Sequence, residues 1–185
     1  YMKGYIAGLF EGDGSLGYYP KKRSYMVRLA LVDKELIERA LEFIQRLGYN
    51  IRPKIRIHKS NSRKHLFKIE AWNKRAYNEI LDAVNEENPS EDYIKGYLAG
   101  IFDAEGSLDR MTLRIAQYDE GIRKKIKLFA ERLGFNFITE ERAVRLLGGK
   151  KEIIRFFATV NPTLQRRKEK ILGTSVSILS NSTIE

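Results

Sequence analysis

The stretch that decides the fold occurs twice, as YMKGYIAGLFEGDGSL at residues 1–16 and as YIKGYLAGIFDAEGSL at residues 93–108. A constant offset of 92 residues relates the two copies. Most aligned positions are identical, and the others exchange residues of similar chemistry. The duplication predicts two related halves, each built around one copy.

Each copy carries a small residue at every fourth position, which places these residues on one face of a helix. Glycine destabilises a helix by about 1 kcal/mol relative to alanine, so its repetition predicts a close approach of two backbones. We therefore expect the two helices to pack face to face. A membrane span is not expected, because each apolar run is short and ends at an acidic residue. The predicted interface consists of Gly4, Gly8, Gly12, Gly96, Gly100 and Ala104.

Each copy ends with an acid followed by glycine, Asp13-Gly14 in the first and Glu105-Gly106 in the second. The glycine is typical of a helix C-terminal stop. If the helices pack in parallel, the two carboxylates meet at helix C-termini, where negative charge is unfavourable. A divalent cation such as Mg²⁺ would relieve this repulsion. The alternative, that each acid is only a solvated helix end, fits a single copy better than a duplicated pair.

Residues 6–14 and 98–106, IAGLFEGDG and LAGIFDAEG, resemble the two motifs of a LAGLIDADG homing endonuclease of the single-chain type. The resemblance implies an α+β fold of two pseudo-symmetric αββαββα halves, at residues 1–88 and 89–185. Their antiparallel strands would form a β-saddle on DNA, with the two motif helices at the centre. It also implies a monomer that cuts double-stranded DNA at a long asymmetric site.

The composition favours an anionic partner. The 185 residues carry a formal net charge of +10, and such an excess is typical of nucleic-acid-binding proteins. The chain has no cysteine, which excludes disulfides and thiolate chemistry. The two histidines lack metal-ligand spacing. No secretory or membrane-spanning segment is visible, so we expect an intracellular location, in the cytoplasm, nucleoid or an organelle.

Hydrophobic periodicity predicts the same element order in both halves. In the first half we expect strands on both sides of a turn at 17–24, a helix at 33–48, a hairpin at 50–71, a helix at 74–84 and a linker at 85–90. In the second half we expect a strand at 111–116, a helix at 119–134, a hairpin at 135–147, a helix at 150–160, a basic helix at 165–172 and an uninformative tail at 173–185.

Phosphodiester hydrolysis needs an activated water and charge relief on the phosphate, which metal ions can supply. Asp13 and Glu105 are the expected catalytic ligands of Mg²⁺, with Mn²⁺ as a substitute. The resemblance adds the backbone carbonyls of Gly12 and Ala104 as ligands. It also implies a catalytic glutamine, for which Gln117 fits while the equivalent position in the first half is a leucine. Lys74 and Lys150 fit the family's lysine, although a surface charge at a helix start is an equal alternative.

The cationic strand faces are the expected DNA-reading surface, because arginine reads guanine in the major groove. For any single residue, a solvated surface charge remains the alternative. We assign the aromatic residues, Trp72 included, to the core. The expected base contacts are Arg28, Arg52, Lys54, Arg56, Lys68, Arg114 and Arg145, and the expected phosphate contacts are Lys21, Lys22, Arg23, Lys59, Arg63 and Lys64.

Three functions are compatible with this pattern. The first is a site-specific double-strand DNA endonuclease of a mobile intron or intein, cutting across the minor groove. The second is an intron RNA maturase on the same scaffold. The third is a DNA-binding protein that does not cleave. Retention of both acids favours the first over the third.

Overall fold

The computed structural model describes residues 1–52, 55–59, 65–109 and 111–163, with the backbone alone at 56–59 and 65. The expected helix at 165–172 and the tail at 173–185 lie outside the described residues. Within them, no helix is long and apolar enough to traverse a lipid bilayer.

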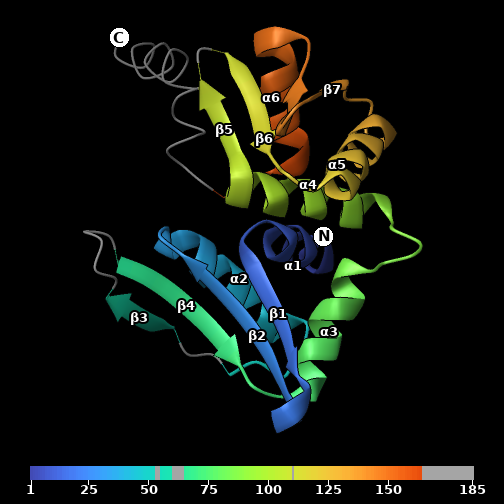
Figure 1. Cartoon of the computed structure of the whole chain (residues 1–185). Coiled ribbons are helices and arrows are strands. Elements are labelled where there is room, and N and C mark those ends of the chain that lie inside the picture. The colour runs from blue at the N-terminus through green and yellow to red at the C-terminus, as the bar shows by residue number, and fades with distance from the viewer. Residues whose placement is uncertain (53–54, 60–64, 110, 164–185) are drawn as a thin grey trace.

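Both halves have the element order αββαββα, which confirms the expected α+β fold (Figure 1). The first half contains α1 (Met2–Asp13), β1 (Gly14–Tyr19), the 3-10 turn η1 (Pro20–Lys22), β2 (Ser24–Leu31), α2 (Lys34–Arg46), β3 (Arg56–Lys59), β4 (His65–Ala71) and α3 (Lys74–Val84). The second contains α4 (Glu91–Glu105), β5 (Gly106–Asp109), β6 (Thr112–Ala116), α5 (Glu120–Arg132), β7 (Phe137–Glu140), β8 (Ala143–Leu146) and α6 (Gly149–Val160).

Each half forms one antiparallel four-stranded sheet, in the orders β1-β2-β4-β3 and β5-β6-β8-β7. Alternate residues of β2, namely Val27, Leu29 and Leu31, are buried in the core. The residues between them, Arg28 and Ala30, point to the opposite face of the sheet. The same alternation recurs in β6. Each sheet therefore has one face in the core and one face open to a partner.

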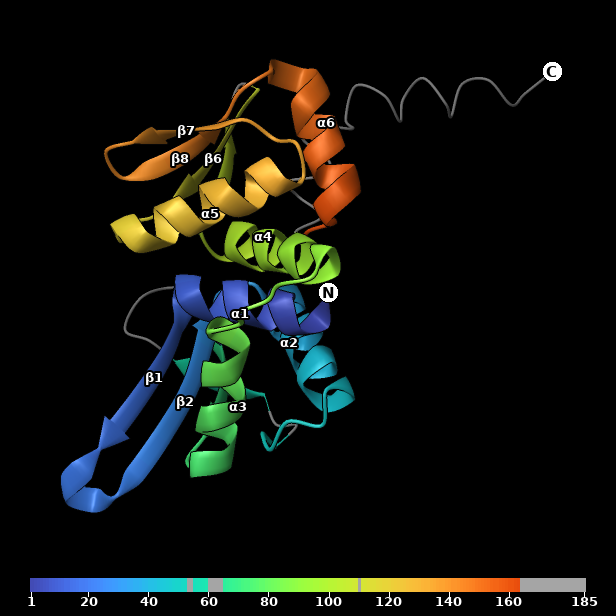
Figure 2. The same cartoon turned by 90° about the vertical axis from the view of Figure 1, so that its right-hand side faces the viewer.

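The helices α1 and α4 lie side by side at the centre of the molecule, with one half on each side (Figures 1 and 2). Contacts advance in the same direction along both helices, from Gly4 against Tyr93 to Gly12 against Ala104. The two helices are therefore parallel, and their C-termini meet at the same end.

Glycine is required at this interface because the two backbones touch. A Cβ atom on Gly8 would lie 2.1 Å from the carbonyl oxygen of Tyr97, and a Cβ on Gly100 would lie 2.1 Å from that of Tyr5. Both distances are far below van der Waals contact, and backbone atoms cannot move aside as a side chain can. All six small residues expected at the helix interface face the other helix.

The first strand of the hairpin at 50–71 is shorter than expected. β3 begins at Arg56, whereas the alternation predicted a strand from Ile51. The amide of Ile51 instead donates to the carbonyl of Tyr49 at 2.8 Å, and the amide of Asn50 donates to the carboxylate of Glu79 at 2.6 Å. These bonds hold a tight turn in which Ile51 is buried. Its apolar character reflects burial in the core rather than strand pairing.

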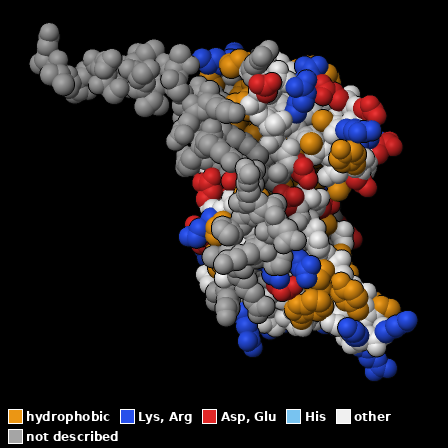
Figure 3. Space-filling model, turned by 60° about the vertical axis from the view of Figure 1, so that its left-hand side comes forward, with side chains coloured by type: hydrophobic (Ala, Val, Ile, Leu, Met, Phe, Trp, Pro, Cys, Tyr) orange, Lys and Arg blue, Asp and Glu red, His pale blue; other side chains and the backbone are white. Residues whose placement is uncertain are grey.

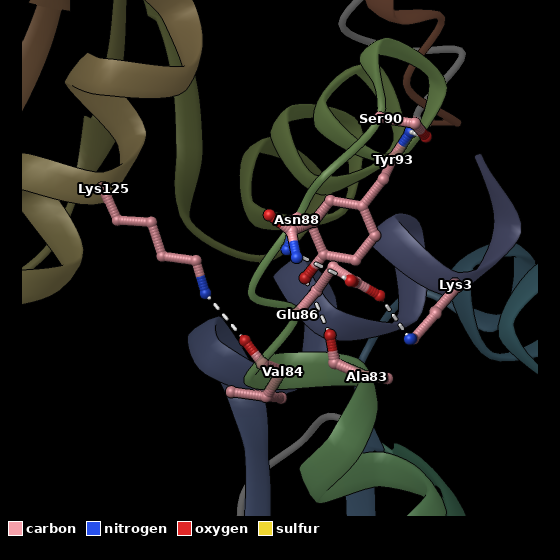
Figure 4. A network of polar contacts seen from close by, with 8 residues as sticks. All are labelled: Lys3, Ala83, Val84, Glu86, Asn88, Ser90, Tyr93 and Lys125. Carbon is pink, nitrogen blue, oxygen red and sulfur yellow. Dashed lines mark hydrogen bonds and ion pairs between the residues drawn. The ribbon is translucent and has the colours of Figure 1, made fainter.

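The linker between the halves is tied to the helices around it (Figure 4). Ser90 accepts a hydrogen bond from the amide of Tyr93 at 3.2 Å and so caps the N-terminus of the second motif helix. The Tyr93 hydroxyl donates to the carbonyl of Ala83 at 2.7 Å. Further contacts join Lys3 to Glu86, the amide of Asn88 to Glu86, and Lys125 to the carbonyl of Val84. The connection is therefore a fixed part of the fold.

Candidate functional site

Two acids from opposite halves meet where the motif helices end. Asp13 is the last residue of α1 and Glu105 is the last residue of α4. A Cβ on Gly12 would lie 2.4 Å from the Cβ of Ala104 and 3.3 Å from the Cγ of Glu105. The parallel packing thus brings the two helix termini into contact and places one carboxylate from each half beside the other.

The electrostatics of this acid pair favour a cation. Burial, followed by the negative charge of Asp13, raises the pKa of Glu105. Both carboxylates also lie at the negative ends of helix dipoles. The donors here are carboxylate oxygens and the carbonyls of the last helical turns, which lie beyond the helix hydrogen-bond ladder. Such hard oxygen donors suit Mg²⁺.

Within the described residues, no group of three or more acids or histidines is arranged to hold a metal ion by itself. The acid pair supplies only two carboxylates. Mg²⁺ commonly takes one or two carboxylates from a protein and completes its shell with water and substrate phosphates. The donor set therefore fits a cation that is shared with a phosphate-bearing substrate.

The glycines after the acids serve a different purpose from the one expected. Gly14 and Gly106 have extended backbones, with φ of −83° and −74°, so neither is a left-handed helix stop. A Cβ on Gly14 would lie 2.4 Å from the ring of Phe10, and one on Gly106 would lie 2.3 Å from the ring of Phe102. Glycine is needed because the chain turns into the first strand directly over a buried aromatic ring.

Gln117 lies at the acid-pair end of the second sheet. It follows β6, in which Ile115 is paired with Gly106, the residue after Glu105. The Gln117 side-chain oxygen accepts a hydrogen bond from the amide of Asp119 at 3.0 Å. The equivalent residue of the first half, Leu31, is buried in the core.

The structure does not bring Lys74 and Lys150 to the acid pair. Lys74 lies over the ring of Tyr25, at 5.9 Å, and Tyr25 is paired with Tyr18 at the turn end of the first hairpin. Four strand residues, about 13 Å at roughly 3.3 Å per residue, separate that level from Gly14. Lys150 lies at the start of α6, the end of that helix farthest from α4 (Figure 1). The fourth strand of each half runs away from the acids, so the catalytic role that the resemblance implied for both lysines stays a prediction that this geometry does not support.

A different cationic side chain, that of Arg142, lies at the acid-pair end of the second half. The amide of Gln117 donates to the carbonyl of Arg142 at 2.9 Å, which fixes the β7–β8 turn beside Gln117. The Arg142 guanidinium lies 5.5 Å from the ring of the exposed Tyr118. Sequence reasoning missed Arg142, although the antiparallel order of the strands could have placed the start of the fourth strand here.

Four of the seven expected base-contacting cations occupy the open faces of the two sheets. Arg28 and Lys68 extend from the first sheet, and Arg114 and Arg145 extend from paired positions of the second. Arg52 is exposed beside the first sheet, and Lys21, Lys22 and Arg23 are exposed at the β1–β2 turn. Lys54, Arg63 and Lys64 lie outside the described residues, as do the side chains of Arg56 and Lys59.

Some aromatic residues are surface residues and not part of the core as expected. Trp72 is 54% exposed, and its ring stacks on that of Tyr19 with centroids 6.0 Å apart. Figure 3 shows a hydrophobic patch next to Lys and Arg side chains at the lower end of the molecule, where the β1–β2 turn lies. Trp72 directly follows the last residue of β4 and points to the open face of the sheet. Sequence periodicity alone could not decide which face of the sheet is open, so the prediction was wrong for this residue.

Two buried acid–tyrosine clusters tie α1 and α4 together, and sequence reasoning missed both. Asp103 is 1% exposed and accepts hydrogen bonds from the Tyr5 hydroxyl at 2.9 Å and the amide of Thr163 at 2.7 Å. Burial, followed by the charge of Asp103, raises the pKa of Tyr5 well above its usual value. Tyr5 therefore stays protonated and donates across the helix interface.

The second cluster, with the halves exchanged, places a lysine between a part-buried acid and a buried tyrosine, whose hydroxyl has no hydrogen-bond partner among the described residues. Lys125 donates to Glu11 at 3.0 Å and lies 4.6 Å from the ring of Tyr97. Burial, followed by the charge of Glu11, raises the pKa of Tyr97. Asp103 and Glu11 each precede a member of the acid pair by two residues. Their contacts therefore help to position the helix ends that carry Asp13 and Glu105.

Comparison with known proteins identifies the class. The family model described as a LAGLIDADG-like domain matches residues 1–82 and 92–161. The chain belongs to this family. An uncharacterized protein of Methanocaldococcus jannaschii is 26% identical over 189 residues, which covers 90% of this chain and 69% of that protein.

Solved structures share the fold at low sequence identity. The homing endonuclease I-DmoI in complex with DNA and Mn aligns with a TM-score of 0.67 and 18% identity, covering 86% of this chain and 95% of that one. The N-terminal LAGLIDADG domain of DUF199/WhiA aligns with a TM-score of 0.60 and 16% identity, covering 86% of this chain and 82% of that one. At these identities the likeness establishes the two-motif LAGLIDADG architecture.

Proposed function

We propose that the protein is a monomeric, site-specific, double-strand DNA endonuclease of the homing type, carried by a mobile intron or intein and acting inside the cell. The observation that carries the proposal is the acid pair, Asp13 and Glu105, at the meeting point of two parallel helices. One acid comes from each half, and each half presents a cationic sheet face beside it. One such centre serves both strands of a duplex.

Asp13 and Glu105 would hold Mg²⁺, assisted by the carbonyls of Gly12 and Ala104. When bound, Mg²⁺ polarises the scissile phosphate and lowers the pKa of a bound water. The protein positions the DNA backbone through the exposed cations of the β1–β2 turn, Lys21, Lys22 and Arg23. Gln117 stands at the acid-pair end of the second sheet, where its amide can orient a water. The first half offers the buried Leu31 instead, so the two strands are cut at unequal rates.

The test begins with selection of bound duplexes from a randomised pool, followed by incubation of the selected DNA with Mg²⁺. The parent protein is expected to cut both strands. Asp13→Asn and Glu105→Gln are expected to bind the same duplexes and to cut at least 100-fold more slowly, as with loss of a principal electrostatic group. Glu87→Gln, an exposed acid of the linker, is the matched control with the same loss of charge and is expected to cut normally.

The DUF199/WhiA likeness makes a DNA-binding protein without cleavage the second candidate. Tight, selective binding by the parent with no cutting in Mg²⁺ or Mn²⁺ would support that candidate. Stimulation of intron splicing without any duplex binding would instead support an RNA maturase. Cutting that persists in both acid variants would reject the acid pair as the catalytic centre.

A further inference from the structure

Among the described side chains, a glutamate lies between the cations on the open face of each sheet. In the first sheet, Glu70 accepts hydrogen bonds from Arg28 Nε at 3.0 Å and Nη2 at 2.8 Å, and from Lys68 Nζ at 3.0 Å. In the second sheet, Glu140 accepts from Arg114 Nε at 2.9 Å and from Arg145 Nε at 2.7 Å. A carboxylate on a surface that binds a polyanion lowers its affinity, so these two acids need a separate explanation.

The two glutamates do not occupy equivalent positions. Glu70 lies on β4 directly opposite Arg28. In the second sheet, the position opposite Arg114 on β8 is taken by Arg145, and the acid comes from β7 instead. A duplication alone would have left both acids in the same place. The same arrangement, an acid that holds an arginine on the open face, was therefore reached from two different strands.

All three arginines donate to a glutamate through Nε, and Arg28 donates through Nη2 as well. The guanidinium group has five N–H donors, so both terminal amino groups of Arg114 and Arg145, and Nη1 of Arg28, lie outside these hydrogen bonds. Beside Arg28 there is a hollow of about 260 Å³, lined also by Ala30, Leu66 and Lys68. The arginines remain accessible, with Arg28 and Arg114 exposed by 42% and 43%. Their free ends can reach the edge of a base.

Direct reading of a base by the glutamates does not fit. A carboxylate can accept from cytosine N4, but both oxygens of each glutamate are already taken by cations. The Glu70 side chain is also only 9% exposed. Burial alone would raise the pKa of Glu70, but hydrogen bonds from Arg28 and Lys68 outweigh burial and lower it. Hydrogen bonds from Arg145 and Arg114 lower the pKa of Glu140. Both acids are therefore ionised at neutral pH.

We propose that Glu70 and Glu140 are positioning residues that determine specificity, because they aim the terminal amino groups of Arg28, Arg114 and Arg145 at guanine bases. Guanine is the base whose O6 and N7 accept two hydrogen bonds from one guanidinium. The target then contains one guanine read by the first half. It contains two neighbouring guanines read by the second half, since Arg114 and Arg145 lie opposite each other on adjacent strands. The inference rests on the proposed DNA substrate but not on cleavage.

The test compares sequence preference in the parent, Glu70→Gln and Glu140→Gln, using a randomised duplex pool and sequencing of the bound fraction. Glu131→Gln is the matched control, because Glu131 is an exposed acid of α5, the helix that covers the core face of the second sheet. Each glutamine variant is expected to lose preference for guanine by about 5- to 100-fold at its own positions. Non-specific affinity is expected to rise, with a salt slope about 1 steeper, because a negative charge has left the binding face. The control is expected to change neither quantity.

Arg28→Lys and Arg114→Lys keep the positive charge but remove the paired amino groups of the guanidinium. They are therefore expected to lose the same guanine preference without a change in salt slope. This second set decides the outcome if a glutamine variant fails to fold. Guanine preference that persists in folded glutamine variants, or arginine variants that keep it, would overturn the proposal. If the parent selects no duplex at all, the proposed function fails instead.

Discussion

Replacing Gly8 with alanine tests the contact on which the site depends. The added Cβ would lie 2.1 Å from the carbonyl oxygen of Tyr97 and 2.7 Å from the amide nitrogen of Ile101. Ordinary contact begins near 3.4 Å, so α1 and α4 must separate by about 1.3 Å. Gly100→Ala makes the same demand from the other side, at 2.1 Å from the carbonyl oxygen of Tyr5.

The expected size follows from two opposing effects. Overpacking costs about 1–3 kcal/mol, and the upper value applies because backbone atoms have no alternative rotamer. Alanine recovers about 1 kcal/mol of helix propensity. The free energy of unfolding should therefore fall by about 2 kcal/mol, which lowers Tm by about 4–8 °C for a chain of this size. Separation of the helix ends should also lower the cleavage rate more than the DNA affinity.

Thermal and urea unfolding of Gly8→Ala, Gly100→Ala and Gly121→Ala provides the assay. Gly121 is the control, since it lies in the exposed first turn of α5 and its Cβ would meet only the Asp119 carboxylate, at 3.1 Å. Its substitution should change the free energy of unfolding by less than about 1 kcal/mol. If Gly8→Ala and Gly100→Ala unfold at the parent temperature, the two helices do not touch as described.

Three further results are expected. The pKa of Glu105 is raised in the folded protein, so without metal the folded state should lose stability as the pH rises from the unfolded pKa through the folded one. Glu105→Gln should therefore raise stability at pH 7 in EDTA by about 0.3–1 kcal/mol; no gain in Tm would contradict the acid repulsion. Asp103→Leu should cost about 2–4 kcal/mol in urea unfolding, because two buried donors lose their acceptor, whereas Asp103→Asn should cost less; equal effects would show that the carboxylate is not the acceptor. Trp72 is the single tryptophan and lies on an open face, so duplex DNA should change its fluorescence, and an unchanged spectrum at saturating DNA would exclude contact near it.

Much of the fold could be predicted from the sequence because its signals are local or repeated. The glycine spacing predicted a helix contact, and the duplicated motif predicted two halves with matching element order. Asp13 and Glu105 could be placed together because parallel helices of equal register end at the same level. These inferences needed only helix geometry and the offset between the copies.

The remaining features depend on strand register, which the sequence does not determine. The pairing of β2 with β4 carries Lys74 to the end of the sheet away from the acids. The same pairing places Glu70 beside Arg28, although 42 residues separate them in the chain. The buried hydrogen bond from Tyr5 to Asp103 joins residues 98 positions apart. Each of these contacts follows from which residues face each other across a sheet or a helix pair, and composition and periodicity carry no such information.

The fixed linker has a consequence for how the proposed substrate is engaged. Hydrogen bonds and an ion pair tie the connection to the surrounding helices, and α1 and α4 touch backbone to backbone. These contacts oppose an opening of the two halves around a duplex. Docking then resembles the approach of two preformed bodies, in which the protein backbone moves little. The DNA then undergoes most of the deformation on binding, because it must bend and narrow its grooves to follow the protein surface. Base-pair steps that no side chain touches would therefore contribute to site choice through their stiffness alone.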